Sequence, residues 1–136
     1  MTKLFLVLSL AGLIAVAQCG ETPELLKMVT ANLRRTCIQR TGVAEDVIDN
    51  TSKGIFANDN KLKCYFKCVF EELTMLDESG QINFNFLLDM LPASARKAAE
   101  KVVEDCKGIT GKDLCDMSYN VNKCAYLSNP QIYFTI

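Results

Sequence analysis

Apolar residues recur every three or four positions in six separate segments of the chain, and this spacing places them on one face of a helix. Turn residues separate the segments, and no stretch alternates apolar and polar residues as a half-buried strand would. The pattern therefore predicts an all-α domain of six helices joined by short loops. The predicted helices cover about residues 23–41, 44–50, 60–76, 83–91, 94–107 and 113–127.

Local signals mark several of the predicted helix ends. Thr22 is a suitable N-cap before Pro23, which is favoured at the first helical position, and Gly42 ends the same helix. Pro92 ends the fourth helix, and Ser94 is expected to cap the fifth. These residues indicate that the helices are short and separated by turns.

The first residues of the chain follow a different pattern. A lysine at position 3 precedes an apolar run from Leu4 to Ala17, and small residues follow. This arrangement is typical of a secretory signal peptide, and the run is too short to span a membrane. Cleavage after Cys19 is favoured because it leaves six cysteines, whereas cleavage after Ala17 would leave seven and one unpaired. The sequence therefore predicts a signal peptide over 1–19 and a secreted domain over 20–136.

Charge and composition exclude several classes of function. Removal of 1–19 takes away one lysine and no acidic residue, which leaves 14 basic and 16 acidic residues. A slightly acidic chain does not favour nucleic acid as a partner. No later stretch is long and apolar enough for stable membrane insertion.

The chain contains no histidine. This removes the Ser-His and Cys-His nucleophile pairs, the imidazole base and the commonest zinc ligand. A secreted enzyme would then need a carboxylate pair such as a glycosidase uses, and no such pair is evident. We therefore expect no enzymatic activity, no catalytic residue, no metal site and no cofactor.

The cysteines indicate a disulfide framework rather than a metal site. Between successive cysteines from Cys37 to Cys124 lie 26, 3, 37, 8 and 8 residues, and no pair has the two-residue gap (CxxC) of a zinc knuckle. Six cysteines allow 15 pairings. Cys64 and Cys68 lie one helical turn apart on one face, so they are expected to reach two different partners. Cys115 and Cys124 project from opposite sides of the last helix, which again requires two partners.

The spacing of these cysteines resembles that of the insect odorant-binding proteins, in the six-cysteine pheromone and general odorant-binding (PBP/GOBP) family. The three residues between Cys64 and Cys68 and the eight between Cys115 and Cys124 carry the resemblance, which covers the whole expected secreted domain. A saposin-like module is another helical six-cysteine fold, but its cysteine spacing differs. The resemblance implies the disulfides Cys37–Cys68, Cys64–Cys115 and Cys106–Cys124, and six helices around a closed apolar cavity.

The resemblance also implies a function. A member of this family would carry small hydrophobic odorants or pheromones through the fluid around sensory neurons and deliver them to olfactory receptors. The alternative is a non-olfactory carrier of a hydrophobic hormone, lipid or xenobiotic with the same fold. The expected partners are a small hydrophobic ligand and an olfactory receptor, and the expected assembly is a monomer or a weak homodimer.

Several apolar and aromatic residues are candidates for the cavity wall. The predicted fourth helix is the most apolar segment of the secreted domain, and the third helix carries an apolar stripe. The alternative for each residue is an ordinary place in the core. The expected ligand-contacting residues are Phe66, Phe70, Leu73, Phe84, Leu88, Tyr119, Tyr126 and Phe134.

The last residues, 131–136, are mostly apolar, which is unusual for a free chain end. Ile132, Tyr133, Phe134 and Ile136 are expected to cover the cavity as a lid or wall, and the alternative is a frayed end or a segment packed on the outside of the domain.

Overall fold

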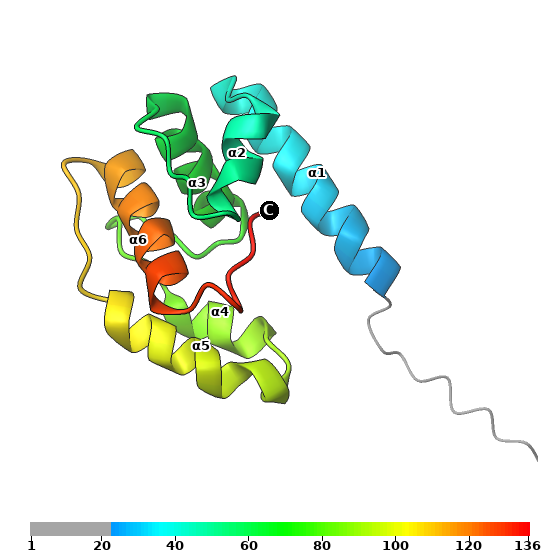
Figure 1. Cartoon of the computed structure of the whole chain (residues 1–136), viewed down its shortest axis with the longest axis vertical. Helices are drawn as coiled ribbons and strands as arrows, with labels where there is room; N and C mark the ends of the chain where they lie inside the picture. Colours follow the sequence, from blue (N-terminus) through cyan, green and yellow to red (C-terminus); the bar gives the residue numbers. More distant parts are fainter. Residues whose placement is uncertain (1–22) are drawn as a thin grey trace, which may run out of the picture.

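A computed structural model describes residues 23–136. The expected signal peptide, its cleavage site and the Thr22 cap lie outside the described residues. Six helices form within the described part of the chain, as the apolar pattern predicts (Figure 1). They are α1 (Pro23–Thr41), α2 (Glu45–Thr51), α3 (Asn60–Glu72), α4 (Phe84–Met90), α5 (Ala93–Cys106) and α6 (Leu114–Ser128).

Side-chain caps explain where several of these helices begin. Asp59 accepts hydrogen bonds from the main-chain N–H groups of Lys61 and Leu62 at the start of α3. Asp113 caps α6 in the same way by accepting from the N–H of Asp116. Helix α5 begins one residue before the predicted cap Ser94, after Pro92, whose fixed φ suits the entry into a helix. The assignment of Ser94 as the cap was therefore wrong.

Helix α3 ends four residues before the predicted Leu76. Thr74 adopts a left-handed conformation with φ of 55°, and its N–H donates to the carbonyl of Glu71. The N–H of Met75 donates to the carbonyl of Phe70, which completes a Schellman motif. A β-branched residue is uncommon in this conformation, so the apolar pattern contained no signal for the stop. After the turn, Leu76 pairs with Ile82 in an isolated antiparallel bridge, and no strand forms within 23–136.

Helix α3 lies at the centre of the core, between α1 and α6. Leu62 and Tyr65 are fully buried, and Phe66 and Val69 are nearly so. Positions three and four apart fall on one helical face, so this set forms a continuous apolar stripe. Cys68 of α3 also belongs to the core, and the rest of the core packs against α3 from α1, from the turn before α2, from α2 and from α6, with Leu33, Cys37, Val43, Ile48 and Tyr119.

Three disulfides tie the helices together. Cys37–Cys68 joins α1 to α3, Cys64–Cys115 joins α3 to α6, and Cys106–Cys124 joins α5 to α6. These are the three pairs that the family resemblance implies. Because α3 and α6 each contribute two cysteines, the bridges connect four helices in one covalent series.

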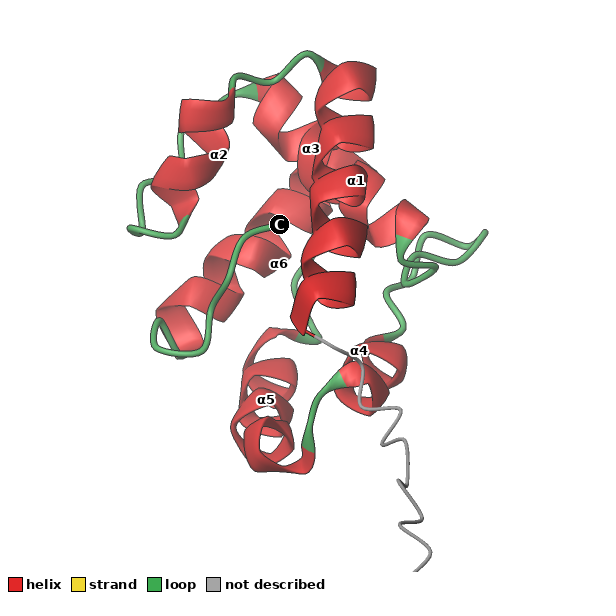
Figure 2. Ribbon diagram, turned by 90° about the vertical axis from the view of Figure 1, so that its right-hand side faces the viewer, coloured by secondary structure: helices red, strands yellow, loops and turns green. Residues whose placement is uncertain are grey.

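The last segment of the chain, residues 129–136, turns back across the domain after α6. Figures 1 and 2 show it running from the end of α6 to a position beside α1. Helices α4 and α5 pack against each other on the side of the domain away from α2. Between Pro23 and Ile136 none of the helices combines the length and the apolar character needed to cross a bilayer.

Candidate ligand-binding cavity

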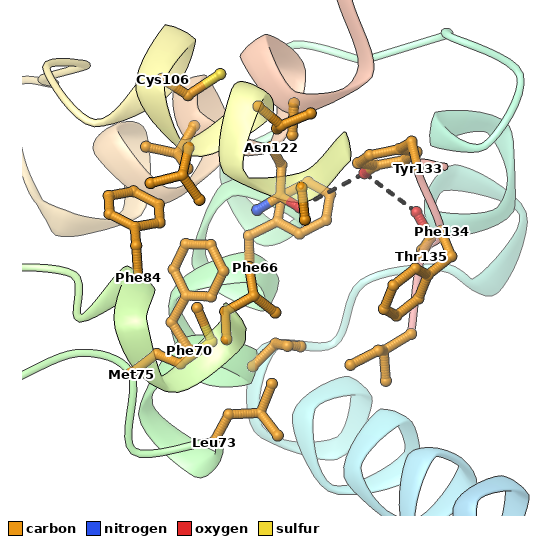
Figure 3. Close-up of a pocket in the computed structure, with 18 of the residues that line it drawn as sticks. Phe66, Phe70, Leu73, Met75, Phe84, Cys106, Asn122, Tyr133, Phe134 and Thr135 are labelled. Atoms are coloured by element: carbon orange, nitrogen blue, oxygen red, sulfur yellow. Dashed lines mark hydrogen bonds between the residues drawn. The ribbon is translucent and has the colours of Figure 1, made fainter. Parts of the chain in front are cut away.

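A cavity of about 430 Å³ lies inside the domain, within the range of roughly 300–1,000 Å³ that is common for small-molecule sites. Its wall comes from four helices, from Met75 in the turn after α3 and from the C-terminal segment (Figure 3). The lining residues are Tyr65, Phe66, Val69, Phe70, Leu73, Met75, Phe84, Leu87, Leu91, Ala95, Ala99, Val102, Val103, Cys106, Val121, Asn122, Ala125, Ile132, Tyr133, Phe134, Thr135 and Ile136.

Helix α3 contributes the aromatic part of this wall. Phe66 lies beside Tyr65 and beside Phe56 of the preceding loop, with ring centroids 5.9 and 6.4 Å apart. Phe70 and Leu73 continue the same face by one further turn. The Schellman turn then places Met75, which is almost fully buried, in the same wall.

Helices α4 and α5 contribute apolar side chains of different sizes. Phe84, Leu87 and Leu91 face the cavity from α4 and its end, whereas Ala95 and Ala99 face it from α5. Small side chains on α5 leave room that larger residues would fill. No residue of α4 is buried, which is consistent with a wall that has the cavity on one side and solvent on the other.

The C-terminal segment closes one side of the cavity and is held by polar contacts. The hydroxyl of Tyr65 donates to the main-chain oxygen of Ile136, and the guanidinium of Arg34 donates to the same oxygen over 3.5 Å. The hydroxyls of Thr135 and Thr51 lie 2.6 Å apart. Phe134 lines the cavity yet is 61% exposed, so the cavity meets solvent at this segment. This placement agrees with the expectation that the last residues form part of the cavity wall.

Arg34 is itself fixed by acidic residues of α2. Its guanidinium donates to the carboxylate of Asp49 over 2.7 Å and lies 3.8 Å from that of Glu45. A planar guanidinium with several donors suits this arrangement, because one side chain can serve two carboxylates and a main-chain oxygen. Arg34 therefore connects α1, α2 and the C-terminal segment.

Polar side chains are few in the cavity wall. Asn122, Tyr133 and Thr135 carry polar side-chain atoms there, in addition to Tyr65, whose hydroxyl is engaged by Ile136. Among residues 23–136, none that lines the cavity has a charged side chain. Burial raises the pKa of Tyr65 to about 12, against the lowering influence of the Arg34 guanidinium, and burial also raises the pKa of Tyr133. Both phenols therefore stay neutral at ordinary pH, and the wall carries no ionised side chain.

Five of the eight residues expected to contact ligand line the cavity, namely Phe66, Phe70, Leu73, Phe84 and Phe134. The structure places the other three, Leu88, Tyr119 and Tyr126, outside its lining. Leu88 lies at the edge of the α4 face formed by positions 84, 87 and 91.

The two tyrosines of α6 pack behind the cavity wall and do not line the cavity. Tyr119 is buried between α3 and α6, where its hydroxyl donates to the carbonyl of Phe56 over 2.9 Å and Lys63 lies over its ring. Tyr126 packs edge-on against Phe56 and Tyr133, with ring centroids 5.9 and 5.5 Å away. The seven-residue spacing of these tyrosines did not reveal which side of α6 faces the cavity.

Sequence reasoning also missed part of the wall. Tyr65 lies on the apolar stripe of α3 and Ala99 on the regular pattern of α5, so both carried a helical signal that is equally typical of core residues. Asn122 and Thr135 carried no such signal because they are polar. Their contribution depends on how α6 and the C-terminal segment are oriented.

The described part of the chain offers no group of side chains for a metal ion beside this cavity. Within 23–136, no three His, Cys, Asp or Glu side chains are grouped so that they could hold a metal ion. The most enclosed ion pair joins Lys63 to Asp116 over 2.9 Å, beside the Cys64–Cys115 bridge. The hydrogen bond between the two side chains raises the pKa of Lys63 and lowers that of Asp116, which suits a structural link between α3 and α6.

Known proteins resemble this chain in sequence and in fold. The model of the PBP/GOBP family matches residues 20–128. The chain is 34% identical to "General odorant-binding protein 69a" of Drosophila melanogaster over 103 residues, which are 75% of this chain and 69% of that protein.

Solved structures show the same arrangement of helices. Odorant Binding Protein 4 of Chrysopa pallens matches with a TM-score of 0.74 and 32% identity, over 83% of this chain and 97% of that one. Odorant Binding Protein 7 of Anopheles gambiae, which has four disulfide bridges and was solved in complex with an azo compound, matches with a TM-score of 0.75 and 25% identity. This match covers 82% of the present chain and 92% of the Anopheles chain.

Proposed function

Since this chain belongs to the PBP/GOBP family of odorant-binding proteins, we propose that it is a secreted carrier that binds a small hydrophobic odorant or pheromone in the 430 Å³ cavity and delivers it to olfactory receptors. The observation that carries this proposal is the cavity itself, which has an uncharged and largely apolar wall and lies inside a disulfide-linked domain. The relative from Anopheles gambiae, solved with an azo compound, supports the same use of this fold.

Burial of apolar surface supplies the binding free energy. A ligand that buries about 200 Å² of apolar surface gains about 5 kcal/mol before the costs of ordering it. We propose that Phe66, Phe70, Leu73, Phe84 and Phe134 provide much of the contact area, since their rings and branched chain line the wall. The three disulfides support a domain with an internal void, which would otherwise lower its stability.

We propose that the C-terminal segment acts as a lid. Residues 132–136 line the cavity, and the segment is held at its end by Tyr65, Arg34 and Thr51. These are hydrogen bonds and packing contacts, so the segment can open without disturbing the disulfide-linked helices. Ligand entry and release would then follow the opening of this segment.

We also propose a non-enzymatic role. It is supported by the lack of histidine in the sequence, by membership of the PBP/GOBP family and by the lack of charged side chains in the cavity wall. Secretion is also proposed here. It rests on the signal peptide expected from the sequence, which lies outside the described residues. Expression in sensory tissue, located by antibody staining, would support the olfactory role over a hormone, lipid or xenobiotic carrier.

Displacement of a fluorescent naphthylamine dye by apolar compounds of graded chain length tests the carrier function. We expect apolar compounds to displace the dye from the unaltered protein. Ala99→Phe should lose dye binding, because the larger ring fills space in the cavity. Ala93→Phe, at an exposed position of the same helix, is the matched control and should bind the dye normally. Absence of displacement by every apolar compound would contradict the proposal.

A further inference from the structure

The chain contains one tripeptide of the form that accepts an N-linked glycan. Asn50, Thr51 and Ser52 follow one another, and the residue between the asparagine and the serine is not proline. None of the other asparagines in the 136 residues has serine or threonine two positions later. Such tripeptides also arise by chance, so the position of Asn50 in the fold decides whether a glycan fits there.

Asn50 lies in the last turn of α2, on the side of the helix that faces away from the core. The buried residues of α2 are Ile48 and Thr51. Asn50 follows Ile48 by two positions, which places it about 200° further around the helix axis. Figure 2 shows α2 and the turn after it at the edge of the domain, and residues 52–55 are exposed. A bulky group on Asn50 therefore extends into solvent without displacing core residues.

The side-chain amide of Asn50 is free to carry such a group. Within 23–136, the main-chain oxygen of Asn50 accepts hydrogen bonds from the N–H groups of Lys53 and Ile55, whereas its side chain has no partner. The one side-chain nitrogen or oxygen in this range that is buried without a partner is Nε of Arg96, so the amide of Asn50 is in contact with solvent. Substitution of its nitrogen breaks no contact of the fold.

An exposed apolar residue lies next to Asn50. Ile55 is 57% exposed, and the 3.0 Å hydrogen bond from its N–H to the Asn50 carbonyl brings it back beside the end of α2. Gly54, with a φ of 81°, makes the turn that permits this return. Covering apolar surface is favourable, and the first sugar of a glycan on Asn50 is attached to the residue that Ile55 contacts.

We propose that Asn50 carries an N-linked glycan whose first sugar covers Ile55. This inference rests on the proposed secretion, since glycan transfer takes place in the secretory pathway, and it does not depend on the ligand. The donor is an oligosaccharide linked to a polyprenyl pyrophosphate. Nδ2 of Asn50 forms a bond to carbon 1 of the first sugar and loses one proton to the transferase. The bond from that carbon to the pyrophosphate oxygen breaks, and the lipid pyrophosphate leaves.

A glycan at this position leaves the cavity unobstructed. Asn50 does not line the cavity. The next residue, Thr51, is buried, and its hydroxyl lies 2.6 Å from that of Thr135 in the C-terminal segment. The contact that holds the segment is therefore on the buried side of α2, and the glycan is on the exposed side.

Mass spectrometry of the protein secreted by insect cells tests the proposal. The full chain is expressed with its own first residues, and the tryptic peptide 41–53, which contains Asn50 and no other asparagine, is analysed before and after peptide-N-glycosidase A. We expect the peptide to carry a sugar mass that the enzyme removes while converting Asn50 to aspartate. A secreted protein whose peptide has only the polypeptide mass overturns the proposal, and this measurement requires no variant.

Four variants identify the acceptor. Asn50→Gln removes the asparagine, and Ser52→Ala removes the hydroxyl that the transferase recognises, so both should be secreted without the glycan. Ser52→Thr keeps that hydroxyl and should keep the glycan. Asn58→Gln changes an exposed asparagine of the following loop and is the matched control, which should also keep it. A glycan that persists in Asn50→Gln lies elsewhere and overturns the assignment.

Urea denaturation tests the contact with Ile55. The glycosylated protein should have a higher urea midpoint than the same chain produced in the bacterial periplasm, which attaches no such glycan. Ile55→Ser should reduce this difference, because the sugar then covers no apolar side chain. Leu127→Ser, at another exposed apolar residue, is the control and should keep it. Equal midpoints of the two preparations, or a difference that persists in Ile55→Ser, overturn the contact between the sugar and Ile55.

Failure of this proposal is distinguishable from failure of the carrier function. Glycosylated protein and Asn50→Gln should release the naphthylamine dye equally to apolar compounds, since Asn50 is not part of the cavity wall. A secreted protein that binds the dye and carries no sugar overturns the glycan alone. A protein that stays inside the cell with its first residues attached contradicts the proposed secretion, and the glycan with it.

Discussion

The side-chain hydroxyl of Tyr65, in the middle of α3, donates a hydrogen bond to the main-chain oxygen of Ile136, 71 positions later in the chain. Tyr65 is fully buried, and its ring also lines the cavity. One residue thus forms part of the cavity wall and holds the segment that closes it.

The first prediction concerns this hydrogen bond. Tyr65→Phe keeps the ring and removes the donor, so the C-terminal segment should open more easily. We expect a loss of about 1 kcal/mol in unfolding free energy, and ligand release about twofold to tenfold faster in stopped-flow dye displacement. Tyr119→Phe loses a comparable hydrogen bond to Phe56 away from the cavity. It should lower stability and leave the release rate unchanged.

The second prediction concerns the whole C-terminal segment. Deletion of residues 131–136 removes five lining residues and the contacts at Tyr65 and Thr51. Helical circular dichroism should be retained because the disulfides and α1–α6 remain, whereas ligand affinity should fall and release should accelerate. Unchanged ligand kinetics in the deletion variant would mean that the segment is not a lid.

The third prediction concerns the end of α3. Thr74 is exposed and holds a φ of 55°, a conformation that glycine adopts without steric cost. Thr74→Gly should therefore raise the unfolding free energy by about 1 kcal/mol, measured by urea denaturation. Thr110→Gly, an exposed position without this backbone conformation, should not be stabilising. If Thr74→Gly is instead less stable, the conformational strain of Thr74 is smaller than the entropy that glycine adds to the unfolded chain.

The fourth prediction concerns the loop behind Tyr126. Gly54 has a φ of 81°, and a β-carbon there would lie 2.7 Å from the Tyr126 ring. Gly54→Ala combines backbone strain with a steric clash, so we expect a loss of roughly 1–3 kcal/mol in unfolding free energy. At Gly108 a β-carbon meets no atom within 4 Å, so Gly108→Ala is the control and should be close to neutral. Equal stability of the two variants would contradict the close approach of Gly54 to Tyr126.

The fifth prediction concerns pH. The pKa of Asp116 is lowered by Lys63, so the stabilisation from this carboxylate is present above its ordinary pKa of 3.8 and is lost as pH falls further. The pKa of Lys63 is raised by Asp116, so its contribution is present below 10.5 and is lost at higher pH. Asp116→Asn should therefore be less stable than the unaltered protein at pH 7, and the difference should shrink at about pH 2–3.

Urea denaturation at both pH values measures this difference. Glu100→Gln, which neutralises an exposed carboxylate of α5, is the control and should change stability little at either pH. A difference that is the same at pH 7 and at low pH would show that the ionised state of Asp116 is not what stabilises the contact.

Several features of this protein could be read from the residues. The helical spacing of apolar side chains predicts the helices because each amphipathic face must be buried, and Pro92 marks the end of α4. The two cysteines of α3 share one helical face and those of α6 project from opposite sides, so in each helix the two cysteines require different partners. The absence of histidine and of excess positive charge removes common catalytic and nucleic-acid-binding arrangements.

The rotation of α6 could not be read in this way. Tyr119 and Asn122 are three positions apart and lie on neighbouring parts of the helix surface. The structure turns Tyr119 toward Phe56 and α3 and leaves the polar Asn122 in the cavity wall. Packing against α3 and the two disulfides of α6 determine this rotation, and no periodicity within α6 contains that information.

The sequence by itself therefore determined the number of helices, the disulfide-linked class and the apolar material for a cavity, because these depend on local spacing and residue type. The tertiary structure decided which side chains face the cavity, where α3 stops and where the C-terminal segment lies. Those features depend on contacts between residues far apart in the chain, such as Tyr65 with Ile136 and Thr51 with Thr135. Only the packed helices bring those groups within hydrogen-bonding distance.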